Sequence, residues 1–109
     1  MDRLFVPLNT GPFEDFQHNG KTYELRGYGR QYTEKHVYAG RKVELRKGYS
    51  GQSLWGMIGN VESGGLEQVL RKVGFKKIVP NAKSKAEAVK EICEILGRKD
   101  KYLAFEVIL

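Results

Sequence analysis

The order of the periodic segments most constrains the fold of this chain. Segments with strand composition lie at 4–6, 22–26, 42–46, 53–61 and 102–109. A helix is expected from Thr10, the predicted N-cap, to Asn19 and Gly20, and apolar stripes predict two more helices over 64–74 and 84–97. Strands outnumber helices and do not alternate regularly with them, so a doubly wound parallel sheet is not expected. The order favours an α+β fold: a small mixed, bent β-sheet that closes into a barrel, with about three short helices packed at its ends.

Local features add detail to this expectation. Pro7 is expected to stop the first strand, and Gly56 and Gly59 inside the longest strand segment predict a bulge or bend that curls the sheet. Trp55 on the same segment is expected to pack in the core or at the barrel mouth. Cys93, on an apolar helical stripe, is expected to be a small core hydrophobe.

Length and composition limit the classes of function. A chain of 109 residues fits one domain over 1–109. No apolar run approaches the roughly 20 residues needed to cross a bilayer, and the first residues do not resemble a secretory signal. These features predict a cytoplasmic protein with no membrane partner. One cysteine and two histidines without ligand spacing predict no metal and no cofactor, and a monomer is favoured over an oligomer.

The net charge of +6 is concentrated between Lys21 and Lys47, where eight basic residues accompany three acidic ones. Five of the six tyrosines lie in or beside this stretch. Basic side chains neutralise phosphates and aromatic rings stack on unpaired bases, so this composition fits RNA contact, and it equally fits a solvated basic surface. The candidate RNA contacts are Tyr28, Arg30, Tyr32, Tyr38, Arg41, Lys42, Arg46 and Lys47.

A smaller constellation lies at the start of this stretch. Strand alternation over 22–26 places Glu24 and Arg26 on one face and Tyr23 and Leu25 on the other. Lys21, at the turn before the strand, has a stem long enough to reach the same face. The three charges can line a cleft for a base or a phosphate, or Glu24 and Arg26 can form an internal ion pair with a structural role.

The pattern Lys21-x-x-Glu24-x-Arg26, after a short helix and at the opening of a strand, resembles the signature of the ASCH domain, a PUA-like β-barrel superfamily. The stretch GFKKIVPNAKSKAEAVKEI resembles the region that joins the two late helices in small archaeal and bacterial members, and YLAFEVIL resembles their last barrel strand. There are two departures: Asn19 stands where the family usually has glycine, and the loop GYGRQYTEKHVYAG is longer and more aromatic. The resemblance implies a PUA-like barrel and a nucleic-acid ligand, with RNA expected.

Some small ASCH proteins are amidohydrolases that remove an acetyl group from acetylated cytidine with a Lys, a Thr three residues later and a distant Glu. By this resemblance Lys21 matches the Lys, Glu24 stands in the Thr position, and Glu62 is the candidate for the distant Glu. A carboxylate beside a lysine raises its pKa, so Glu24 is expected to oppose Lys21 as a neutral base.

The sequence therefore predicts an RNA-binding module with a Lys21, Glu24 and Arg26 cleft beneath a loop rich in Tyr and Arg. The alternatives are a hydrolase acting on a modified nucleoside, an RNA-cleaving enzyme, and an adaptor for an acidic protein partner.

Overall fold

The computed structural model describes residues 2–109 and contains one five-stranded sheet in the order β1-β3-β4-β5-β2. The strands are β1 (Leu4–Leu8), β2 (Tyr23–Gly27), β3 (Lys42–Lys47), β4 (Ser53–Gly64) and β5 (Tyr102–Ile108). The helices are α1 (Thr10–His18), α2 (Leu66–Val73) and α3 (Lys85–Leu96), with a 3-10 turn η1 (Phe75–Lys77) between the last two. Strands β1 and β3 are parallel, and the other neighbours are antiparallel.

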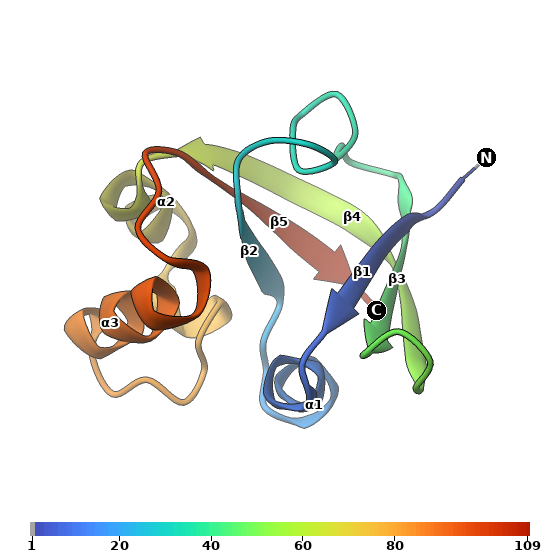
Figure 1. The fold of residues 1–109 in the computed structure, drawn as a ribbon, viewed down its shortest axis with the longest axis horizontal. Coiled ribbons are helices and arrows are strands. Elements are labelled where there is room, and N and C mark those ends of the chain that lie inside the picture. The colour runs from blue at the N-terminus through green and yellow to red at the C-terminus, as the bar shows by residue number, and fades with distance from the viewer. Residues whose placement is uncertain (1) are drawn as a thin grey trace.

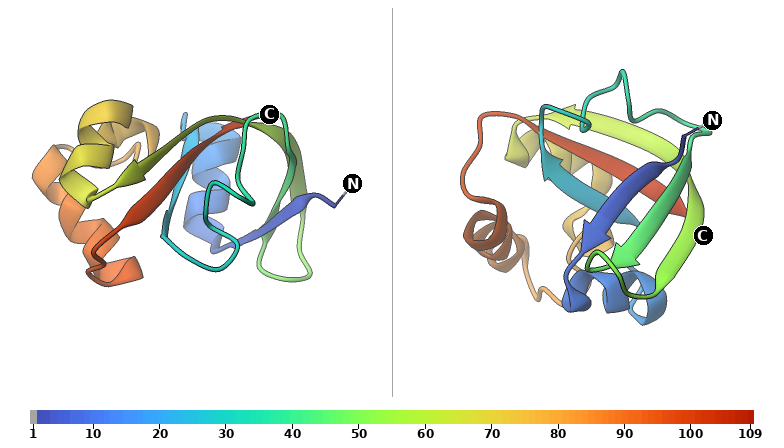
Figure 2. Two further views of the ribbon diagram at one scale, coloured as in Figure 1. Left: turned by 90° about the horizontal axis from the view of Figure 1, so that it is seen from above. Right: turned by 45° about the vertical axis from the view of Figure 1, so that its right-hand side comes forward.

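The sheet curls until its two edge strands, β1 and β2, lie on either side of an opening (Figure 1). Helix α1 lies below this opening, and α2 and α3 form a separate group at one end of the molecule (Figures 1 and 2). This architecture confirms the predicted α+β fold with a mixed, bent sheet and three short helices. The sheet is a curled half-barrel, which is consistent with a PUA-like barrel.

The curl depends on an irregularity in β4. The pairing of β4 with β5 shifts register between Ile58 and Val61, which confirms the irregularity predicted at Gly59. A Cβ atom at Gly56 would lie 2.6 Å from the carbonyl oxygen of Ile108 on β5. Glycine at position 56 therefore permits the close approach of β4 and β5 just before this irregularity.

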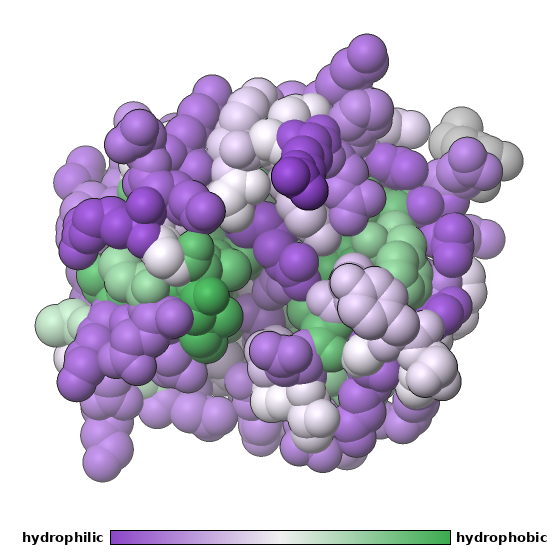
Figure 3. Space-filling model, viewed as in Figure 1, coloured by the Kyte–Doolittle hydropathy of each residue, from purple (hydrophilic) through white to green (hydrophobic). Residues whose placement is uncertain are grey.

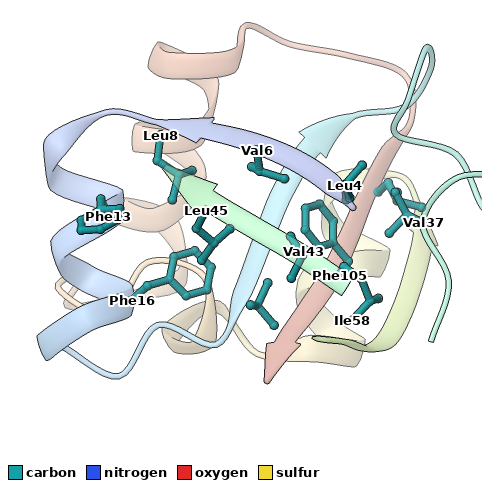
Figure 4. Packing of buried hydrophobic residues seen from close by; sticks show 12 residues of the cluster. Leu4, Val6, Leu8, Phe13, Phe16, Val37, Val43, Leu45, Ile58 and Phe105 are labelled. Carbon is teal, nitrogen blue, oxygen red and sulfur yellow. The ribbon is translucent and has the colours of Figure 1, made fainter. Parts of the chain in front are cut away.

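Two apolar clusters lie on opposite faces of the sheet. The cluster inside the barrel includes Leu45, Ile58 and Phe105, and Phe13 and Phe16 of α1 point into it beside Leu45 (Figure 4). The second cluster packs Tyr23 and Leu25 of β2 against α2 and α3, with members Val69, Leu70, Val73 and Ile92. Because side chains alternate along β2, the burial of Tyr23 and Leu25 under the helices turns Glu24 and Arg26 toward the barrel opening.

Several local predictions are wrong. Strand β1 continues through Pro7 to Leu8; it is an edge strand, where a missing N–H does not interrupt the sheet. The N-cap of α1 is Asn9, and Thr10 is the first helical residue. Trp55 is 53% exposed, because Gly56 takes the inward position on β4 and Trp55 points outward. Cys93 is only partly buried.

Among residues 2–109, no helix combines the length and the apolar character needed to span a membrane.

Candidate functional site

Glu24 is the centre of a cluster of paired charges at the barrel opening. Its Oε2 accepts a hydrogen bond from Arg26 Nε at 2.9 Å and lies 2.8 Å from the second terminal nitrogen of Arg26. Its Oε1 lies 3.4 Å from Lys21 Nζ. Lys21 and Glu24 are both buried, and the Arg26 side chain is 21% exposed. The three predicted residues therefore come together, and they pair with one another.

The two cations of this cluster also join separate parts of the fold. Arg26 donates to the carbonyl oxygen of Pro7 at 2.8 Å, which links β2 to β1 across the opening, and to the Tyr32 hydroxyl at 3.2 Å. Lys21 Nζ donates to the carbonyl oxygen of Ile78 at 2.5 Å, which links the start of β2 to the segment after η1. The cluster consequently closes part of the open side of the barrel.

Burial lowers the pKa of Lys21 below its ordinary value, and the Glu24 carboxylate offsets this effect only in part. Glu24 raises the pKa of Lys21, as predicted for a carboxylate that opposes a neutral amine, but removal of the ammonium group from water has the larger effect.

A cleft of about 530 Å³ lies above this cluster, with Lys21, Glu24 and Arg26 in its lining. Apolar side chains of the lining come from α1, from the segment after η1 and from α3, and include Pro12, Val79 and Ile95. Figure 3 shows a hollow near the centre of this face, with hydrophilic residues between two apolar areas. The cleft thus combines a polar floor with apolar walls.

The floor keeps hydrogen-bonding capacity. The partner of Glu24 Oε1 is Lys21 Nζ, at the long distance of 3.4 Å. The Lys21 ammonium has three N–H groups, and one of them donates to the carbonyl oxygen of Ile78. An acceptor and a donor therefore lie side by side. Asp15 and Glu91 also line the cleft, so its acids outnumber Lys21 and Arg26. This balance favours an uncharged polar group at the floor over a phosphate.

The predicted basic track along β3 is largely occupied by internal contacts. Arg46 donates to Glu44 Oε2 at 2.8 Å through Nε and to the Tyr49 carbonyl oxygen at 2.9 Å. Arg41 donates to the carbonyl oxygens of His36 and Asp2. Lys47 lies 4.0 Å from a Glu14 oxygen. Lys42 is exposed and does not line the cleft.

The reason for the Arg46 pairing is that Glu44 is almost completely buried, at 1% exposure, on the outer face of β3. The sequence pattern places Glu44 on a polar face but does not reveal that Arg3 and Arg46 cover it. Arg3 Nε donates to Glu44 Oε1 at 3.0 Å, and both guanidinium groups also lie against the Phe5 ring.

The predicted tyrosines have different environments. Tyr32 stacks on Phe105 inside the barrel, with ring centroids 6.1 Å apart, so its ring is not open to a base. The Tyr28 hydroxyl donates to Glu34, and Lys101 Nζ lies 3.9 Å from the Tyr28 ring centroid. Tyr38 is 42% exposed, and Arg30 is exposed in the loop after β2.

Tyr49 is the exposed aromatic residue that lines the cleft, and it was not among the predicted site residues. Its exposed fraction is 77%, and it lies in the turn between β3 and β4. Tyr49 belongs to the tyrosine-rich part of the sequence, but the sequence does not show that the turn between β3 and β4 lines the cleft.

Glu62 lies apart from this site. It is on β4 opposite Ala104, on the sheet face that carries α2, with Oε1 3.7 Å from Lys72 Nζ and Oε2 accepting from Asn60. The set of Lys21, Glu24 and Glu62 considered for catalysis is therefore not assembled. Within residues 2–109, no group of three or more His, Cys, Asp or Glu side chains is arranged to hold a metal ion.

Two solved structures share this fold. The crystal structure of hypothetical protein PH0355 has a TM-score of 0.79 at 19% sequence identity, with 98% of this chain and 98% of that chain covered. The solution NMR structure of protein PF0455 from Pyrococcus furiosus has a TM-score of 0.67 at 16% identity, with 98% and 96% covered. At these identities the likeness shows the fold alone. Comparisons with protein-family models and with curated proteins find no match.

Proposed function

We propose that this protein is an RNA-binding module whose cleft receives a nucleobase. The proposal rests on the buried floor, where Glu24 Oε1 and Lys21 Nζ present an acceptor beside a donor. The edge of a nucleobase carries the complementary donor and acceptor, and unpaired bases of single-stranded RNA are recognised in this way.

The walls support the same ligand class. Pro12, Val79 and Ile95 provide apolar contact, and the exposed Tyr49 ring at the rim can stack on a flat base. The net charge of +6 attracts a polyanion to the molecule even though the floor of the cleft is not basic.

We also propose that the chain is an ASCH domain. The residues of the Lys21-x-x-Glu24-x-Arg26 pattern meet at the floor of one cleft, and the sheet is a curled half-barrel, as the resemblance implies.

The test compares Glu24→Gln with Glu44→Gln. Both substitutions replace a buried carboxylate that pairs with the arginine two residues later, but only Glu24 lines the cleft. Titrations of isotope-labelled protein with the four ribonucleosides and a mixed-sequence single-stranded RNA, followed by NMR, give affinity and location together. We expect Glu24→Gln to weaken binding about tenfold or more, since the hydrogen bond of a charged acceptor is worth roughly 1.5–3 kcal/mol.

The variant Glu44→Gln is the matched control and should bind RNA as the wild type does. Equal affinity of all three proteins, or no binding by the wild type at low salt, would contradict the proposed function.

A second candidate function is hydrolysis of a modified nucleoside at the same cleft. It is favoured by the burial of Lys21, which lowers its pKa and makes a neutral, proton-accepting amine more accessible. Chromatography of acetylated cytidine incubated with wild type and with Lys21→Met tests it. Turnover that depends on Lys21 would establish a hydrolase. Binding of a base without turnover would support the RNA-binding module instead.

A further inference from the structure

A second hollow, of about 610 Å³, adjoins the cleft and shares Pro7, Arg26 and Tyr49 with it. The rest of its lining comes from the last residue of β2, from the loop after it and from Lys99, which precedes β5. No Asp or Glu from residues 2–109 lines it, whereas Arg26, Arg30 and Lys99 do. We call it the basic hollow. Its charge is opposite in sign to that of the acid-rich cleft beside it.

The cations of the basic hollow differ in their availability. Arg26 is paired with Glu24 at the boundary between the two spaces. Arg30 and Lys99 are exposed, and within the described chain neither side chain makes an ion pair. Two cations without a carboxylate partner can therefore meet an anion in this hollow without first breaking an internal pair.

Arg30 has a backbone conformation that usually belongs to glycine. Its φ is +52°, in a two-residue turn closed by hydrogen bonds between Gly29 and Tyr32. A left-handed conformation is sterically unfavourable for a non-glycine residue. The turn therefore carries a long cationic side chain at a position that glycine would occupy with less strain.

The stem of Lys99 lies against the end of β2. A Cβ atom built at Gly27 would lie 3.4 Å from Lys99 Cε, an ordinary van der Waals distance, so the lysine stem crosses the end of the strand at Gly27. This packing holds the stem of Lys99 over β2, beside the loop that carries Arg30.

We propose that the basic hollow binds a phosphate of the nucleotide whose base enters the cleft. The inference rests on the proposed function and deepens it, because it makes the ligand a phosphorylated nucleotide of single-stranded RNA and not a free nucleoside. The acid-rich floor takes the uncharged base, Arg30 and Lys99 take the phosphate, and Tyr49, which lines both spaces, lies between the two parts of the ligand.

The test compares the four ribonucleosides with their 5′- and 3′-monophosphates and with inorganic phosphate, in NMR titrations at low salt. At least one series of monophosphates should bind the wild type about tenfold more tightly than the nucleosides, an increment within the range of one charge-assisted hydrogen bond. Arg30→Gly should remove most of this increment and leave nucleoside affinity unchanged. Glycine suits a φ of +52°, so this variant is expected to fold.

The matched control is Lys42→Ala, which removes an exposed cation that lines neither space and should keep the increment. If nucleosides shift the NMR signals of the cleft residues but monophosphates bind no more tightly, the phosphate site in the basic hollow is refuted and the proposed function stands. Equal losses in Arg30→Gly and Lys42→Ala would also refute it. If inorganic phosphate binds but a base adds no affinity, or if nothing binds, both proposals fail.

Discussion

The tripeptide Glu-Leu-Arg occurs twice, at 24–26 in β2 and at 44–46 in β3, and each glutamate is buried beside its arginine. Their other neighbours differ. Glu44 accepts hydrogen bonds from Arg3 at 3.0 Å, from Arg46 at 2.8 Å and from Ser53 Oγ at 2.6 Å. Among residues 2–109, the only partner of Glu24 Oε1 is Lys21 Nζ at 3.4 Å, and Glu24 lines a cleft. The same tripeptide thus forms a saturated structural pair in one strand and a site with spare bonding capacity in the other.

The Glu44 environment predicts acid sensitivity. The hydrogen bond from Ser53, followed by those from Arg46 and Arg3, lowers the pKa of Glu44 from 4.5 to about 2. A carboxyl group with a lowered folded-state pKa stabilises the fold above its unfolded pKa, and this contribution is lost as the pH falls through the folded value. We therefore expect the stability difference between wild type and Glu44→Gln to be largest near neutrality and to shrink between about pH 5 and pH 2.

Urea denaturation of both proteins at several pH values measures this difference. A difference that stays constant down to pH 2 would mean that the Glu44 carboxylate is not stabilised by its neighbours.

At the scale of elements, the bend in β4 controls how far the sheet curls and therefore how close β1 and β2 come to each other. Two glycines have different roles in this bend. A Cβ at Gly56 would meet a backbone atom, the carbonyl oxygen of Ile108, at 2.6 Å. A Cβ at Gly59 would meet Glu106 Oε1 at 2.4 Å, which is the end of a flexible side chain.

We therefore expect Gly56→Ala to destabilise the protein more than Gly59→Ala does. Relief of the clash at Gly56 requires the paired backbones of β4 and β5 to separate, which costs about 1–3 kcal/mol. At Gly59 the Glu106 side chain can rotate away, at the loss of its hydrogen bond from the Asn60 amide. Thermal unfolding of the two variants measures which one is less stable. Equal stabilities, or a less stable Gly59→Ala, would show that the contact of position 56 with the Ile108 carbonyl oxygen does not limit the approach of β4 and β5.

At the scale of the whole molecule, the sequence predicted features that depend on the pattern within one segment better than features that depend on contacts between distant segments. Alternation along β2 correctly placed Tyr23 and Leu25 opposite Glu24 and Arg26, and the glycines correctly marked the bend. The burial of Glu44 depends on Arg3, from a distant segment. The position of Tyr49 at the cleft depends on a turn that comes to line the same cleft as residues of α3 and β2 only in the folded chain. Such contacts between distant segments leave no periodic signal in the sequence.

The cleft lies between two layers, the barrel with α1 and the group of late helices, so each layer should contribute to ligand affinity. Ile95 on α3 lines the cleft and is 62% exposed. We expect Ile95→Ala to weaken ribonucleoside binding roughly three- to tenfold, because burial of its aliphatic end under a base is worth about 1 kcal/mol. The melting temperature of Ile95→Ala should barely change, since an exposed side chain adds little packing and alanine favours helix.

Ile108→Ala is the matched control: Ile108 is 54% exposed on β5, outside the cleft lining, and its truncation should leave affinity unchanged. Equal affinities of the two variants in the same titration would show that the helical layer does not contact the base.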